Sequence, residues 1–186
     1  NLYQCRYEGY QMKIILVGLI AILLSVTAYD QWVEMDKYRL VSISNSMIES
    51  YERGDHDSVI MGLLDLDTEK NLNAEIHYNA SSFFYIYHTQ LTTGHGMSKQ
   101  DIYDRIIYHA RAAVEADPNE VLYQRDLAMS LMIPFLSFQF REVDFDRDAA
   151  RDAFHVLRGS GADGVWAESY IRKIANSTHY PKGLSQ

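Results

Sequence analysis

The stretch SKQDIYDRIIYHARAAVEADPNEVLYQRDLAMSL, residues 98–131, decides the fold class of this chain. Ser98 followed by Asp101 matches the capping-box pattern at a helix start, so a helix is predicted from 98 to 116. The turn residues Asp117-Pro118-Asn119 end this helix, because proline cannot continue one. A second helix is predicted from Glu120 to about Phe140. The stretch therefore predicts two helices joined by a short turn.

Further helices are predicted on both sides of this pair from the spacing of apolar residues and from turn signals. They cover residues 57–66, 73–91, 146–158 and 164–176. Thr92–Gly96 is expected to break the chain before Ser98, and Pro134 is expected to interrupt the helix that begins at Glu120. Strand signals are scarce, so the predicted class is all-α.

Three windows, 40–69, 74–118 and 119–158, resemble tetratricopeptide repeats. The most characteristic piece is AVEADP, residues 113–118. The resemblance implies stacked antiparallel helix pairs, a capping helix over about 164–178, and a concave groove that recognises other proteins. An irregular helical bundle is the alternative, and in both arrangements neighbouring helices bury one another's apolar faces.

An apolar run near the N-terminus, IILVGLIAILLSVTAY (Ile14–Tyr29), holds sixteen residues without a charge. We expect an uncleaved signal anchor that crosses a membrane once and continues as a helix to about Arg53-Gly54. The alternative is a signal peptide that begins at Met12 and is cleaved after Ala28.

These expectations divide the chain into four segments. They are a cytoplasmic tail (1–11), a transmembrane anchor (12–33), a tetratricopeptide-like helical domain (34–178) and a C-terminal tail (179–186). Arg6 and Lys13 precede the apolar run, and short-loop positive charge favours the cytoplasm. The N-terminus is thus expected inside and the helical domain outside, in the periplasm if the source is bacterial.

The charge distribution excludes one class of partner. The net charge is −8, and residues 1–29 contribute +1 through Arg6, Lys13 and Glu8, which leaves −9 for the rest. Nucleic acid is not expected to bind a domain this acidic. The single cysteine, Cys5, excludes an intrachain disulfide framework.

The sequence contains no phosphate loop, nucleophile elbow or dinucleotide fingerprint, so we predict no enzyme, no cofactor and no metal. A metal- or ligand-binding module that uses His88, His95 and His109 is kept as an alternative. Asn79 and Asn176 begin glycosylation acceptor triplets, which matter only if the source glycosylates exported proteins.

The aromatic segment 76–90 and the uncharged segment 128–140 are candidate contact surfaces. The predicted partner-binding residues are Phe84, Tyr87, Tyr123 and Trp166. Small residues that would let another membrane helix approach are Gly18, Ala21 and Ser25. The segment 128–140 is expected either to be buried or to dock against a membrane partner.

The predicted function is a membrane-anchored scaffold, accessory to a larger integral membrane complex, with the lipid bilayer as a second partner. An alternative is an accessory subunit of a respiratory or photosynthetic complex, whose −9 domain attracts a basic soluble redox carrier.

Overall fold

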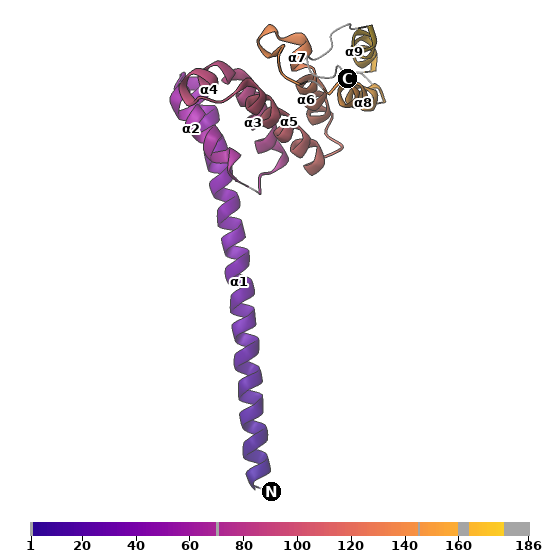
Figure 1. Cartoon of the computed structure of the whole chain (residues 1–186). Coiled ribbons are helices and arrows are strands. Elements are labelled where there is room, and N and C mark those ends of the chain that lie inside the picture. The colour runs from indigo at the N-terminus through magenta and orange to yellow at the C-terminus, as the bar shows by residue number, and fades with distance from the viewer. Residues whose placement is uncertain (1, 70, 145, 160–163, 177–186) are drawn as a thin grey trace. The chain divides into compact units, whose positions relative to one another are not determined.

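The computed structural model describes residues 2–69, 71–144, 146–159 and 164–176, and within these it leaves out the side chains of 2–21, 23, 164, 165 and 176 (Figure 1). The described residues form helices and no strand, as predicted. The helices are α1 (Leu2–Arg53), α2 (His56–Asp67), α3 (Ala74–Ile86), α4 (His88–His95), α5 (Lys99–Ala116), α6 (Val121–Leu131), α7 (Ile133–Leu136), the 3-10 turn η1 (Phe138–Phe140), α8 (Arg147–Arg158) and α9 (Gly164–Asn176).

The chain divides into two compact units, residues 1–42 and 43–186. The first unit consists of helix α1 up to Ser42, and its apolar side chains from Leu24 to Tyr38 are exposed. Among the described side chains, no helix has an apolar stretch long enough to cross a membrane. Most of the run Ile14–Tyr29 lies outside those side chains, so the membrane anchor stays a prediction.

Helix α1 ends where the sequence predicts. Gly54 follows Arg53 with φ of 74°, a conformation that glycine adopts without strain.

Close approach of the end of α1 to α2 also depends on a glycine. A Cβ atom at Gly62 would lie 2.5 Å from Cγ of Met47, which is buried.

The predicted helix 73–91 is wrong in one respect, since it is divided at Tyr87 into α3 and α4. The expected break at Thr92–Gly96 is also wrong, because α4 continues to His95. The hydroxyl groups of Thr92 and Thr93 donate hydrogen bonds to backbone carbonyl oxygens one helical turn earlier, at 2.8 and 2.9 Å. Gly96, with φ of 66°, ends the helix instead.

Helices α5, α6, α8 and α9 begin within one residue of the predicted positions, whereas the segment predicted as one helix to about Phe140 is divided into α6, α7 and η1. Ser98 and Asp101 form the predicted capping box at the start of α5. The predicted interruption by Pro134 is confirmed, because α6 ends at Leu131 and the proline opens the short helix α7. Asp146 accepts a hydrogen bond from the Ala149 amide and so caps the start of α8.

The second unit is held together by contacts between helices that are neighbours in sequence. The principal contacts join α2 to α3, α3 to α5, α5 to α6, α6 to α8 and α8 to α9, while α4 and α7 are short connections (Figure 1). Fully buried side chains lie along this order, among them Leu63, Phe84, Ile106, Ala128 and Phe154. The core is therefore a series of helix–helix interfaces, which position α3 and α6 on either side of α5.

Candidate functional site

Two of the four predicted partner-binding residues lie in the core. Phe84 is fully buried, stacks on the ring of His109 and lies beneath the guanidinium of Arg105. Tyr87 is 1% exposed, and its hydroxyl is 2.9 Å from Nδ1 of His56. A partner at the described surface would not reach either ring, so both residues contribute to packing here.

The other two predicted residues are half-buried. The rings of Tyr123 and Tyr78 lie 5.6 Å apart, which joins α6 to α3. Trp166 contacts the Phe154 ring, and the guanidinium of Arg125 lies 5.1 Å from the centre of its indole ring. These two residues keep part of their surface available.

The remaining predicted positions are only partly described by the structure. Ser25 is exposed on α1, whereas the surroundings of Gly18 and Ala21 lie outside the described part. Asn79 is half-buried on α3, and the side chain of Asn176 is also outside that part.

The three histidines of the alternative metal site are also separate. Nδ1 of His88 is 2.7 Å from the carbonyl oxygen of Tyr85, His95 is exposed at the end of α4, and His109 is buried in α5. Among the described residues, no three histidine, cysteine or acidic side chains are grouped to hold a metal ion.

His109 instead belongs to a partly buried polar cluster that the sequence did not predict. The cluster contains Asp67 of α2, His77 of α3 and Arg105 and His109 of α5. The Nδ1 atoms of the two histidines lie 2.8 Å apart, and Nε2 of His109 is 3.4 Å from Oδ1 of Asp67. Arg105 forms an ion pair with Asp67.

Both histidines of this cluster are held neutral. Burial, with a smaller contribution from the nearby Arg105 cation, lowers the pKa of His109 to about 4. Burial and the neighbouring His109 lower the pKa of His77 to about 4. If neutral His109 donates from Nε2 to Asp67, its Nδ1 accepts a hydrogen bond from Nδ1 of His77. The cluster is internally satisfied and joins α2, α3 and α5.

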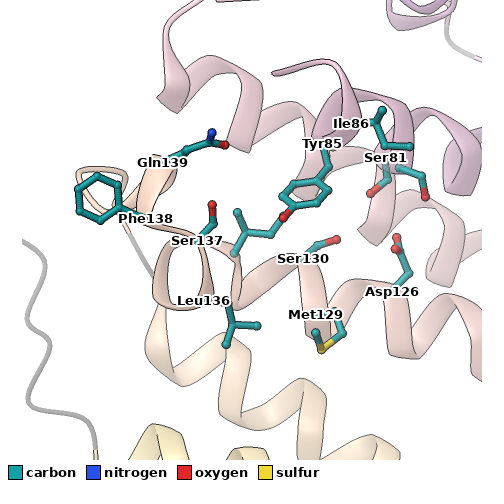
Figure 2. Close-up of a pocket in the computed structure, with 12 residues that line it drawn as sticks. Ser81, Tyr85, Ile86, Asp126, Met129, Ser130, Leu136, Ser137, Phe138 and Gln139 are labelled. Atoms are coloured by element: carbon teal, nitrogen blue, oxygen red, sulfur yellow. The ribbon is translucent and has the colours of Figure 1, made fainter. Parts of the chain in front are cut away.

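A pocket of about 760 Å³ lies between α3 and α6, and the α7–η1 segment lines one end of it (Figure 2). Its walls combine apolar side chains with several hydroxyls and one carboxyl group. The lining residues are Ser81, Ser82, Tyr85, Ile86, Asp126, Met129, Ser130, Ile133, Leu136, Ser137, Phe138 and Gln139. Phe138 is 77% exposed, Leu136 47% and Tyr85 43%, so the pocket opens beside an apolar surface.

Asp126 and Ser81 lie at the end of the pocket opposite Phe138 (Figure 2). Oδ2 of Asp126 and Oγ of Ser81 are buried, and neither forms a hydrogen bond of normal geometry with the described residues. Burial raises the pKa of Asp126 to about 6, and the Ser81 hydroxyl offsets this only in part. No basic side chain is among the described residues that line the pocket with this carboxyl group.

The sequence carried a weak signal for this pocket. Asp126, Met129, Ser130 and Ile133 are spaced i, i+3, i+4 and i+7, so they share one face of the helical segment. Asp126 is the one charge on that face. Its burial depends on α3, which lies about 40 residues earlier in the chain and cannot be placed from the sequence alone.

Comparison with protein-family models, with curated proteins and with solved structures finds no match for this chain. The fold and the pocket define an all-helical protein of serially packed helices, and no family or repeat is assigned to it.

Proposed function

We propose that this chain is a membrane-anchored protein-binding subunit that holds a partner in the groove between α3 and α6. The pocket between these helices, with exposed apolar side chains at its mouth, is the observation that carries the proposal. Monomeric proteins seldom expose apolar surface beside a preformed pocket unless something binds there.

The order of helix packing supports a tetratricopeptide-like arrangement of the domain 34–178. In such an arrangement α3 with α5, and α6 with α8, would be the second and third helix pairs, and α9 would cap the third pair. The first helices of successive pairs then line one surface. In this chain those helices are α3 and α6, the two that form the pocket.

The exposed apolar residues of α1 support the membrane anchor. Leu24, Val26, Tyr29 and Trp32 are each more than half exposed. Lipid would cover the apolar ones, while tyrosine and tryptophan suit the membrane–water interface. The proposed location is thus the membrane, with the helical domain outside the cytoplasm as part of a larger complex.

Site-directed photo-crosslinking in native membranes tests this function. A photoreactive amino acid at Phe138 is expected to crosslink to a partner protein, whereas the same residue at Val156 is not. Val156 is a matched control because it is exposed on α8, away from the pocket lining. Equal labelling from both positions, or none from either, would contradict the proposed function.

A further inference from the structure

We propose that the pocket between α3 and α6 receives a lysine or arginine side chain from a bound peptide segment, with its cation placed at Asp126 and Ser81. This inference rests on the proposed function, because it names what the partner inserts into the groove.

The first argument is the unpaired carboxyl group. A buried carboxylate without hydrogen bonds is unfavourable, and proteins normally pair such a group or leave it exposed. Asp126 Oδ2 has neither solvent nor a hydrogen-bond partner among the described residues. An incoming ammonium or guanidinium group would supply both the charge and the donors, and the Ser81 hydroxyl could accept a second hydrogen bond.

The second argument is the chemistry of the walls between Asp126 and the pocket mouth. Met129, Ile133 and Tyr85 provide apolar surface along this path, and no basic side chain is among the described residues that line the pocket. Lysine and arginine carry a charged end on an aliphatic stem, and they bury the stem against apolar surface. The pocket therefore matches both parts of such a side chain.

The third argument concerns the residues that flank the basic one. Leu136 and Phe138 are exposed at the mouth, so apolar side chains next to the inserted residue would cover them. The pocket is also large enough for one long side chain and part of its neighbours. The net charge of −9 outside residues 1–29 would attract a basic segment before it docks. The expected ligand is a basic residue between apolar ones.

Binding of short labelled peptides to the full chain in detergent tests the inference. The probes are fluorescein-labelled Gly-Leu-Xaa-Leu-Gly peptides in which Xaa is lysine, norleucine or glutamate. Norleucine keeps the aliphatic stem and removes the charge. We expect the lysine peptide to bind about tenfold more tightly than the norleucine peptide, and the glutamate peptide to bind most weakly.

Asp126→Asn is the decisive variant, because asparagine keeps the shape of the side chain. The preference for lysine over norleucine is expected to disappear in this variant, while norleucine binding changes less than about twofold. Asp152→Asn is the matched control, since it removes the same charge from a side chain that is 72% exposed on α8. This control is expected to keep the tenfold preference.

Each contrary result has a distinct meaning. Equal affinity for lysine and norleucine peptides would overturn the inference and leave the groove as a peptide site. Hexylamine that binds as tightly as the lysine peptide would also overturn it, because the site would then take small amines. Competition by neutral phosphatidylcholine vesicles would overturn it in favour of lipid contact. Failure of every peptide, together with equal crosslinking from positions 138 and 156, would overturn the proposed function itself.

Discussion

Asp67 on α2 and Asp126 on α6 both carry a carboxylate between packed helices, but the two carboxylates differ in their hydrogen-bond and ion-pair partners. Asp67, whose side chain is 13% exposed, is paired with Arg105 and accepts a hydrogen bond from His109. Asp126 has a buried oxygen without a hydrogen-bond partner among the described residues. The first carboxylate is balanced within the protein, whereas the second has no such partner among the described residues, which is why we propose that it binds a cation from outside.

This comparison separates a structural polar cluster from a candidate binding site. Buried polar groups generally stabilise a fold when their hydrogen bonds are satisfied, and they destabilise it when they are not. A protein that keeps an unsatisfied charge in a pocket gives up stability there, which is common at functional sites. The same substitution at the two positions should therefore change stability in opposite directions.

The largest effect is expected for Asp67→Asn. The variant loses the ion pair to Arg105 and weakens the hydrogen bond from His109, so the free energy of unfolding should fall by about 3 kcal/mol. Urea unfolding of the full chain in a mild detergent, followed by circular dichroism, measures this change. A loss well below 1 kcal/mol would show that the cluster is not what joins α2 to α5.

Asp126→Asn is expected to stabilise the fold at pH 7 by about 2 kcal/mol. The pKa of Asp126 is about 6 in the folded protein, against an ordinary value of 3.8. The charged form is thus disfavoured in the folded state, a penalty that is complete above pH 6 and absent below pH 3.8. The same urea experiment at pH 7 and pH 4 should show the gain only at pH 7. Destabilisation at pH 7 would mean that Asp126 is satisfied after all.

Gly62→Ala tests the close packing of α2 against the end of α1. Helix α2 carries Asp67, so this packing also positions the paired carboxylate. The added methyl group would meet Met47, so the free energy of unfolding should fall by about 1–2 kcal/mol. Gly94→Ala is the matched control on α4, because nothing lies within 4 Å of its added Cβ. The control should be stabilised by a few tenths of a kcal/mol to 1 kcal/mol. Equal effects at the two glycines would contradict the close approach of α1 and α2.

The smallest effect per residue is the pH dependence contributed by His77 and by His109. Their pKa values of about 4 lie below the ordinary value of 6.5, so the unfolded chain takes up protons that the folded chain does not. Stability from these groups is full above pH 6.5 and is lost as the pH falls toward 4. Between pH 7 and 5.5 the loss should be about 1 kcal/mol for each histidine.

Protonation of Asp126 stabilises the fold as the pH falls, which is opposite to the effect of the two histidines. The Asp126→Asn variant removes this contribution, so its pH dependence reports on the histidines. Acidification should destabilise that variant more steeply than the parent chain, and His109→Phe should remove part of the slope. If the free energy of unfolding fell equally steeply with pH in all three proteins, neither Asp126 nor the histidines would control the response to acid.

The sequence predicted the helices wherever the signal was local. Ser98 with Asp101 marked the start of α5, and Gly54 and Pro134 marked interruptions, because each acts on its own stretch of backbone. The division at Tyr87 was missed, since it involves no glycine or proline. The Tyr87 side chain bonds to His56, 31 residues earlier in the chain.

The polar cluster and the candidate site were missed for the same physical reason. His77 and His109 are 32 residues apart in sequence, and the burial of Asp126 depends on α3 from the preceding helix pair. Phe84 and Tyr87 were predicted as contact residues because the segment 76–90 holds too many aromatic residues for one face. The structure buries these two rings between neighbouring helices, whereas Tyr85 and Ile86 of the same segment are exposed, together with Leu136 and Phe138.

The order in which the helices pack also bears on how the chain is synthesised. Because each helix contacts mainly its next neighbours, a pair can form soon after both of its members leave the ribosome. The pocket, however, needs α6 and η1 in place against α3. The pocket is therefore completed only after residue 140 has emerged, and an emerged segment that ends before this residue would fold in part without forming the pocket.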